Sequence, residues 1–316
     1  MRLARLTSLF VLPALLLGTP ARAEFPESSG SFTRSIGTIA GHERSFYFYA
    51  PKDLNPGAPF LFVFHGGGDG GAAREGTGHG FEVLADKEGF LIAYPDGISR
   101  SWNTCRKEPL SAAKRMKVDD VAFVEAMIAQ AYATYRIDLK RVFAMGHSNG
   151  GQLAHRLAME RPQKFAAIAA ISANLPAPEN MDCMPAGAPM PVLVMNGTAD
   201  PVSPYQGGKR LRQGRFAGET LSTDETLRYW VAMNGLDDTP EKQRLPHITS
   251  SDRTSVDRVT WRAPGKAAAV LYTINNGGHL VPQPYWRFPS QVGLQTGDID
   301  ATQIIWDFFK DAASRK

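Results

Sequence analysis

Short runs of apolar residues recur along this chain and alternate with segments of helical periodicity. Residues 59–64 are all apolar, which is typical of a strand buried on both faces of a sheet. Residues 44–49 alternate bulky with polar side chains and also predict a strand. Similar runs predict further strands at 90–94, 141–145, 165–171, 192–195, 256–261 and 269–274. Residues 24–40 are rich in serine and glycine, and we expect them to form an exposed start.

Helical periodicity separates most of these runs. It predicts helices at 81–88, 120–135, 152–158 and 300–312. A capping box, formed by Ser222 and Glu225, predicts another helix that stops at Asn234 and Gly235. Residues 205–220 form a long polar segment between predicted elements. Strands that alternate with helices indicate the α/β class, with a mostly parallel central sheet and helices on both faces.

The first 23 residues have the pattern of a secretory signal peptide. Arg2 and Arg5 precede an apolar run at 9–17, and Ala21-Arg22-Ala23 is a cleavage signal. A retained membrane anchor is the alternative. With no internal repeat and no clear linker, residues 24–316 are expected to form one catalytic domain. The product is expected to be secreted, either to the periplasm or to the extracellular medium.

Charge gives no sign of a nucleic-acid partner. The chain has 35 Lys+Arg and 31 Asp+Glu, a net charge of +4. Arg2, Arg5 and Arg22 lie in the leader, so residues 24–316 keep 32 basic and 31 acidic side chains, a net of +1. No stripe of Lys and Arg suggests nucleic-acid binding. Hydrophobic residues at 43% and charged residues at 21% are ordinary for a globular protein.

Two cysteines, Cys105 and Cys183, are the only ones in the sequence. Outside the cytoplasm such a pair is expected to form a disulfide, which would stabilise the fold by roughly 4 kcal/mol in the chain-entropy model. Two free buried thiols are the alternative. Without a histidine pattern nearby, the two cysteines do not predict a zinc site.

The segment Gly146-His147-Ser148-Asn149-Gly150 matches the pattern G-x-S-x-G. A predicted strand precedes it and a predicted helix follows it, so Ser148 would lie at a sharp turn that only small neighbours permit. The start of the helix would offer free N–H groups and the positive end of a dipole to a developing oxyanion. A chance match in a glycine-rich turn is the alternative.

A serine hydroxyl needs a base to remove its proton, and the base needs an acid to orient it. In this architecture the acid and then the histidine follow the serine along the chain. Asp200 comes soon after the predicted strand 192–195, where α/β sheets place working residues. Its competitors do not directly follow a buried strand; they are Asp237, Asp238, Asp252 and Asp257.

His279 directly follows the predicted strand 269–274, and Gly277 and Gly278 would allow a mobile loop to swing its ring over the serine. The other histidines lack this placement. His147 flanks the serine, His155 lies on the following helix, and the rest lie in polar or glycine-rich segments or in the loop described next: His42, His79, His247 and His65.

His65-Gly66-Gly67-Gly68 follows the predicted strand 59–64. Such a glycine loop allows backbone N–H groups of Gly66 and Gly67 to approach a substrate carbonyl oxygen, and Asn149, after the serine, would supply the other N–H of the oxyanion hole. His65 itself is expected to hold the loop. The alternative for this segment is a flexible glycine turn.

Taken together, several segments resemble the secreted esterases grouped with polyhydroxybutyrate depolymerases, which include feruloyl and acetylxylan esterases. The match covers nearly all of residues 24–316. The matching segments are His65-Gly66-Gly67-Gly68, Tyr94-Pro95-Asp96-Gly97, Ser101-Trp102-Asn103, Val118-Asp119-Asp120-Val121, Gly146-His147-Ser148-Asn149-Gly150-Gly151, Gly197-Thr198-Ala199-Asp200-Pro201 with Pro204-Tyr205, and Gly277-Gly278-His279 with Pro282.

The resemblance implies an α/β-hydrolase fold, a Ser148, Asp200 and His279 triad, and no cofactor or metal. It also implies that Trp102 and Asn103 lie near the substrate cleft. Asp119 and Asp120 are interpreted as caps of the following helix, with substrate binding as the alternative. The sequence departs from the family at Leu280 and Val281, where threonine and tryptophan are usual, which weakens any transfer of substrate preference.

We therefore predict a secreted serine hydrolase of carboxylic esters that resembles the polyhydroxybutyrate depolymerases. A feruloyl or acetylxylan esterase is the alternative; a serine peptidase and a non-catalytic binding protein rank below both. The expected partner is a polyester oligomer or a polysaccharide ester, with no nucleic acid and no membrane once the leader is cleaved. The protein is expected to be a monomer.

Overall fold

The computed structural model describes residues 27–68, 80–212, 215–248, 251–285, 287 and 290–314. The predicted signal peptide, residues 1–23, lies outside the described residues, as does His79.

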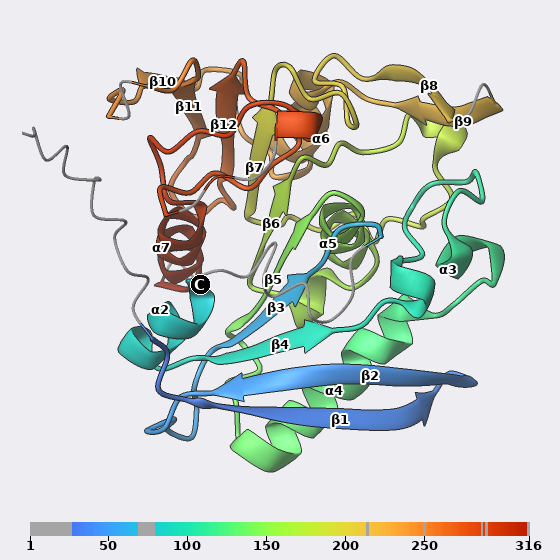
Figure 1. The fold of residues 1–316 in the computed structure, drawn as a ribbon, viewed down its shortest axis with the longest axis vertical. Coiled ribbons are helices and arrows are strands. Elements are labelled where there is room, and N and C mark those ends of the chain that lie inside the picture. Colours follow the sequence, from blue (N-terminus) through green and yellow to red (C-terminus); the bar gives the residue numbers. More distant parts are fainter. Residues whose placement is uncertain are drawn as a thin grey trace, which may run out of the picture.

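One twisted sheet organises the described chain (Figure 1). Its strand order is β1-β2-β4-β3-β5-β6-β7-β12-β11-β10, and the strands from β4 to β12 in this order are parallel. The outer strands join antiparallel. The strands span Ser31–Ile39 (β1), His42–Ala50 (β2), Phe60–Phe64 (β3), Leu91–Pro95 (β4), Val142–His147 (β5), Ala167–Ile171 (β6), Val192–Gly197 (β7), Glu241–Arg244 (β10), Ser255–Trp261 (β11) and Ala269–Asn275 (β12).

Helices cover both faces of the sheet, as predicted. Helices α4 (Asp120–Tyr135), α5 (Asn149–Glu160) and α6 (Thr223–Met233) pack on one face. Helices α2 (Phe81–Glu88) and α7 (Ala301–Ser314) pack on the other (Figure 1). A short helix, α3 (Ala112–Arg115), lies in the connection between β4 and α4. The expected α/β-hydrolase architecture is thus confirmed.

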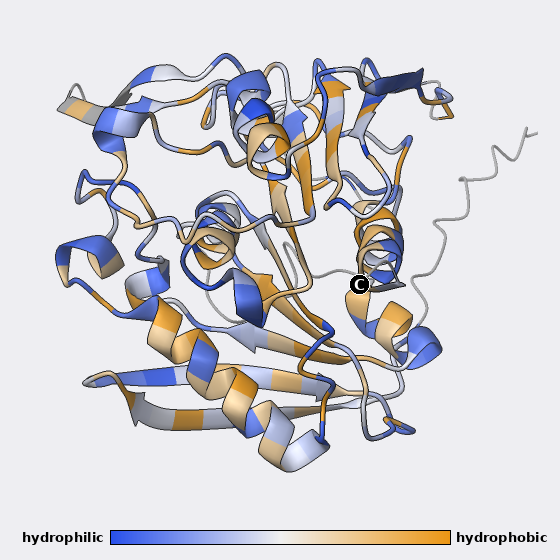
Figure 2. Cartoon of the chain, turned by 180° about the vertical axis from the view of Figure 1, so that it is seen from behind, coloured by the Kyte–Doolittle hydropathy of each residue, from blue (hydrophilic) through white to orange (hydrophobic). Residues whose placement is uncertain are grey.

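The alternation of side chains along β3 divides the core into two layers. Phe60, Phe62 and Phe64 pack toward α4 and α5, whereas Leu61 and Val63 pack toward α2 and α7. All five are buried, which explains the unbroken apolar run in the sequence. Figure 2 shows the same distribution, with hydrophobic residues concentrated in the central strands and on the helix faces turned toward them.

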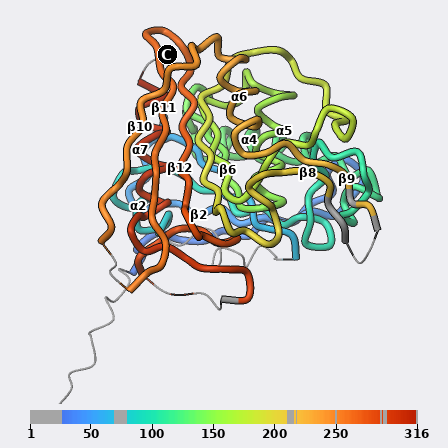
Figure 3. Tube along the Cα trace, turned by 90° about the horizontal axis from the view of Figure 1, so that it is seen from above, coloured from blue at the N-terminus to red at the C-terminus, as the bar shows by residue number. Residues whose placement is uncertain are grey.

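Four strands were not predicted from the sequence, namely β1, β10 and the two strands of a hairpin. Strand β1, in the segment expected to be only an exposed start, is exposed along most of its length and is held by pairing with β2. Strand β10 is exposed throughout. The long polar segment 205–220 contains an antiparallel hairpin, β8 (Gly208–Arg212) and β9 (Arg215–Thr220), at the far side of the molecule from β10 (Figure 3).

Side-chain caps fix the starts of two helices. Ser222 and Glu225 form the predicted capping box at the start of α6. Asp119 caps α4 by accepting a hydrogen bond from the N–H of Ala122 at 2.9 Å. The next residue, Asp120, is fully buried and forms an ion pair with buried Arg44 on β2 at 2.7 Å. Both aspartates are therefore structural, but only Asp119 is a cap; the expectation that Asp120 also caps the helix was wrong, because its carboxylate is used in the buried ion pair.

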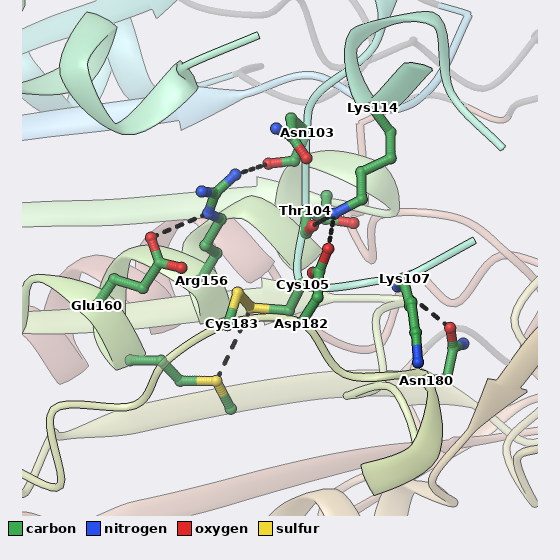
Figure 4. Close-up of a disulfide and its surroundings, with 11 residues drawn as sticks. Asn103, Thr104, Cys105, Lys107, Lys114, Arg156, Glu160, Asn180, Asp182 and Cys183 are labelled. Carbon is green, nitrogen blue, oxygen red and sulfur yellow. Dashed lines mark hydrogen bonds and ion pairs between the residues drawn. A yellow bond between two sulfur atoms is a disulfide. The ribbon is translucent and has the colours of Figure 1, made fainter. Parts of the chain in front are cut away.

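A disulfide joins Cys105 to Cys183, with their Cα atoms 4.9 Å apart (Figure 4). Cys105 lies in the connection between β4 and α4, and Cys183 lies in the connection between β6 and β7. The bond closes a loop of 78 residues in sequence separation, so it restricts the unfolded chain strongly.

Replacing both cysteines with alanine should lower the free energy of unfolding by about 4 kcal/mol, because the unfolded chain regains the entropy of the open loop. Urea unfolding at equilibrium measures this. The oxidised wild type should lose the same stability when dithiothreitol is added, whereas the double variant should not respond to it. Equal stability of the wild type and the double variant would contradict the structural role of the bond.

His155 lies inside the protein on α5 and is 1% exposed. Its ring stacks on Trp230, with centroids 5.9 Å apart, and its Nε2 lies 3.4 Å from the carbonyl oxygen of Ala173. Burial lowers the pKa of His155 from 6.5 to about 4, because the interior disfavours the charged ring. The sequence left open whether this residue is packed or exposed, and the structure shows that it is packed.

This burial predicts an acid-sensitive stability. Above about pH 6.5 the ring is neutral in both states, and its contribution is present in full. As the pH falls from 6.5 to about 4, only the unfolded chain takes up the proton, so stability should fall by roughly 3 kcal/mol in total. Urea unfolding at pH 7, 5.5 and 4 should show this extra loss in the wild type but not in His155→Gln. Parallel losses in the two proteins would refute it.

Candidate active site

Ser148 lies in the turn between β5 and α5, in the position predicted for a nucleophile. Its backbone has φ 54° and ψ −117°, a conformation that non-glycine residues rarely adopt. The N–H of Ser148 donates to the carbonyl oxygen of Ile171 at 2.8 Å, which anchors the turn to the end of β6. The side chain therefore stands at the carboxyl edge of the sheet, at the start of a helix.

Neighbouring glycines make this turn possible. A Cβ atom on Gly146 would overlap the backbone of Gly150, and one on Gly150 would overlap the carbonyl oxygens of Phe64 and His65. A Cβ atom on Gly151 would come within 2.7 Å of the Ala173 side chain. The pattern of small residues around Ser148 thus reflects close packing of α5 against β3 and β6.

Asp200 and His279 form a buried acid–base pair. His279 donates from Nδ1 to Asp200 Oδ2 at 2.7 Å. The other carboxylate oxygen, Oδ1, accepts hydrogen bonds from the N–H groups of Val202 and Ser203, both at 2.7 Å. The carboxylate is therefore oriented on both sides and holds the proton of His279 on Nδ1. This arrangement leaves the lone pair on Nε2 to act as a base.

The two loops that carry this pair are tied together. The N–H of Ala199 donates to the carbonyl oxygen of Gly277 at 2.9 Å. The N–H groups of Gly278 and His279 donate, each at 2.7 Å, to carbonyl oxygens of the segment 292–294. A Cβ atom on Gly278 would overlap that segment. The glycines before His279 therefore serve close packing, and not the freely swinging loop that the sequence suggested.

His279 lies beside the turn that carries Ser148. Its ring centroid is 4.8 Å from that of His147, the residue before the serine. Burial, and then repulsion by His279, lower the pKa of His147 from 6.5 to about 3. His147 is consequently neutral at ordinary pH and adds no second positive charge beside His279.

The glycine loop after β3 lies against the residue that follows the serine. A Cβ atom placed on Gly67 would be 3.5 Å from the Cβ of Asn149, so the two segments predicted to form the oxyanion hole are neighbours. His65 orients the loop: its Nδ1 lies 2.7 Å from the carbonyl oxygen of Gly66, and its Nε2 accepts from the N–H of Gly97 at 2.9 Å.

These two contacts define the protonation of His65. Because Nε2 accepts a hydrogen bond, the ring proton is on Nδ1 and is donated to the carbonyl oxygen of Gly66. The C=O of Gly66 and the N–H of Gly67 belong to one planar trans peptide and point in opposite directions. Fixing the oxygen therefore fixes the N–H of Gly67 as well.

Trp102 joins the glycine loop to the serine turn. Its indole Nε1 donates to the carbonyl oxygen of His65 at 2.9 Å, and its backbone N–H donates to Asn149 Oδ1 at 2.7 Å. The Trp102 side chain is fully buried, so it lies behind the glycine loop and supports it. Sequence reasoning placed Trp102 near the cleft but missed this bridging role, which no spacing pattern could reveal.

Asn103 lies next to this bridge and is 9% exposed. Its backbone N–H donates to Asp120 Oδ2 at 2.7 Å, and its Nδ2 donates to the carbonyl oxygen of Val118 at 2.8 Å. The predicted cleft residues Trp102 and Asn103 are thus both held in place by buried hydrogen bonds.

Three of the four aspartates that competed with Asp200 form ion pairs with arginines. Asp252 pairs with Arg287, Asp257 pairs with Arg244, and Asp238 pairs with Arg228. Within the described parts of the chain, no group of three or more His, Cys, Asp or Glu side chains could hold a metal ion. In those same parts, no helix has the length and apolar character needed to cross a membrane.

Known proteins are similar to this chain in sequence and in fold. The sequence profile of the α/β hydrolase fold matches residues 59–255. NocK of Nocardia uniformis subsp. tsuyamanensis, which is named as an esterase, is 30% identical over 296 residues, covering 90% of this chain and 84% of NocK. Feruloyl esterase C of Emericella nidulans is 27% identical over 289 residues, covering 89% and 88% of the two chains.

Among solved structures, the acetyl xylan esterase from Aspergillus awamori has the same fold. It superposes with a TM-score of 0.56 at 17% identity, covering 80% of this chain and 96% of that one. The chain therefore belongs to the α/β hydrolase fold family, where it groups with esterases, enzymes that hydrolyse carboxylic esters.

Proposed function

We propose that this protein is a secreted serine esterase that removes feruloyl or acetyl groups from plant polysaccharide. One observation carries the chemistry: the hydrogen-bonded pair of Asp200 and His279 lies beside the strained turn of Ser148. The substrate class is supported by the relatives, which are named feruloyl and acetylxylan esterases.

In this mechanism, Ser148 Oγ attacks the ester carbonyl carbon while His279 Nε2 takes the hydroxyl proton. The positive charge that forms on the imidazole is stabilised by Asp200, whose carboxylate is already oriented by two backbone N–H groups. The carbonyl oxygen becomes an oxyanion and accepts hydrogen bonds from the N–H groups of Asn149 and the Gly66–Gly67 turn.

Collapse of this intermediate expels the alcohol, which takes the proton from His279, and leaves an acyl group on Ser148. Water then attacks the acyl-enzyme with His279 again acting as the base, and the free acid is released. The neutral ring of His147 favours this sequence, because a second cation beside His279 would oppose the formation of imidazolium.

A polyhydroxybutyrate depolymerase is the second candidate, and the sequence motifs of the site support it. The segments around His65, Trp102, Ser148 and Asp200 resemble a group of secreted esterases that includes these depolymerases together with the polysaccharide esterases. Leu280 and Val281 replace the threonine and tryptophan usual after the histidine, so the acyl preference has to be measured.

Localisation and domain organisation belong to the same proposal. The leader pattern at residues 1–23 supports export to the periplasm or the medium. The proposal also includes one catalytic domain at 24–316 and a monomeric product. No cofactor takes part in the proposed reaction.

Replacing Ser148 with alanine should lower kcat for p-nitrophenyl acetate by a factor on the order of 10⁶, because no nucleophile remains. Ser172→Ala is the matched control, since Ser172 lies at the end of the neighbouring strand β6 and its hydroxyl has no hydrogen-bond partner among the described residues. It should keep its activity. Circular dichroism should show that both variants are folded. Full activity of Ser148→Ala would exclude the serine mechanism.

Purified protein without residues 1–23 should hydrolyse methyl ferulate or acetylated xylan with a higher kcat/KM than amorphous polyhydroxybutyrate. Release of ferulate, acetate and 3-hydroxybutyrate measures the three reactions. Preference for the polyester would replace the first candidate with the second. Faster cleavage of a matched amide than of the ester would indicate a peptidase, and failure to react with a fluorophosphonate would indicate a non-catalytic protein.

A further inference from the structure

A basic pocket with a volume of about 380 Å³ lies beside the disulfide. We call it the basic pocket; its charged lining consists of five cationic residues and one carboxylate, namely Lys107, Lys114, Arg115, Lys117, Arg156 and Asp182. The first four cations come from the connection between β4 and α4, and Arg156 comes from α5. Figure 4 shows Lys107, Lys114, Arg156 and Asp182 grouped around the disulfide.

The positive charge of the basic pocket is only partly compensated. Lys114 pairs with Asp182, and Arg156 pairs with Glu160 at 3.1 Å. The three other cations, Lys107, Arg115 and Lys117, are exposed and have no ion pair with a described carboxylate. Uncompensated cations around a hollow raise the local concentration of anionic ligands.

Asn103 lies in the wall of the basic pocket and positions one of its cations. It is 91% buried, its Nδ2 donates to Val118 and its backbone N–H donates to Asp120. Its backbone oxygen accepts a hydrogen bond from Arg156 at 2.8 Å. This bond holds the Arg156 guanidinium at the pocket, beside the exposed cations that a ligand can reach.

The basic pocket is close to the proposed reaction centre. Asn103 directly follows Trp102, whose N–H bonds to the side chain of Asn149, the residue after Ser148. Arg156 lies eight residues beyond Ser148, or about 12 Å along the helix. A separation of this size is within the length of a short oligosaccharide.

We propose that the basic pocket binds the carboxylate of a uronic acid residue near the ester-bearing sugar of the substrate. Arg115 and the lysines would hold the carboxylate. This inference rests on the proposed function, which supplies an ester on a sugar chain, and adds that the preferred polysaccharide is acidic.

The test compares xylo-oligosaccharides of equal length, with and without one glucuronic acid substituent, in titration calorimetry with Ser148→Ala. The substituted oligosaccharide should bind at least tenfold more tightly at 50 mM salt, and the difference should shrink at 500 mM because salt screens the charges. Equal affinities at low salt would overturn the proposal.

A charge-matched pair of triple variants locates the effect. Lys107→Gln, Arg115→Gln and Lys117→Gln, made together in the Ser148→Ala protein, should remove most of the tenfold preference. The control is Lys52→Gln, Lys87→Gln and Lys140→Gln, which removes the same charge from exposed positions next to the opposite ends of the parallel strands. The control should keep the preference. Equal loss of the preference in both triple variants would show that only net charge matters and would overturn the proposal that the basic pocket binds the uronate.

Hydrolysis of methyl ferulate and acetylated xylan by the wild type separates this inference from the function on which it rests. Hydrolysis without any uronate preference would refute the basic pocket and leave the esterase intact. Uronate binding without hydrolysis would refute the esterase, and the pocket would then describe an acidic-sugar binding protein. Thermal unfolding of both triple variants should match that of the Ser148→Ala protein, because the replaced side chains are exposed and the hydrogen bonds that Arg115 donates to the carbonyl oxygens of Pro109 and Leu110 lie at the surface.

Discussion

The backbone of Ser148 is the constraint around which the site is arranged. A residue at φ 54° and ψ −117° is strained, and it persists only where the surrounding packing allows no other path for the chain. That packing is supplied by glycines: Gly146 and Gly150 lie so close to neighbouring backbone that no side chain fits. The strained turn holds Ser148 above the sheet, starts α5 at the next residue and brings Asn149 against the glycine loop after β3.

Support for this arrangement comes from the connection between β4 and α4. Trp102 bonds to both the glycine loop and Asn149, and the backbone of Asn103 is held by Asp120, which is paired with Arg44. A buried ion pair adds little net stability because desolvation opposes it. We therefore interpret this pair as fixing the position of the connection, whose farther part is fixed by the disulfide at Cys105.

The features that could be predicted from the sequence are those that depend on burial and on the order of strands along the chain. Apolar runs gave the central strands, and Asp200 and His279, 79 positions apart, were chosen because each follows a strand of the parallel sheet. Edge strands such as β1 and β10 were missed because they are exposed and depend on pairing alone. Contacts between distant loops, such as Trp102 with His65, leave no periodic signal. The basic pocket could not be predicted either, because the fold brings Arg156 of α5 next to the cations of residues 107–117.

The connection between β4 and α4 thus contributes both to the proposed oxyanion hole, which needs fixed atoms, and to the basic pocket, which is lined by exposed side chains. In its buried part, Trp102 bonds to the glycine loop and to Asn149, which carry the N–H groups that would stabilise the oxyanion, so changes there should disturb the chemical step. In its exposed part, the side chains of Lys107 and Lys117 face solvent, so their charge can vary without moving those groups. A single loop can therefore keep the catalytic geometry fixed while its outer residues adapt to different substrates, which fits a family in which one fold serves several polysaccharide esters.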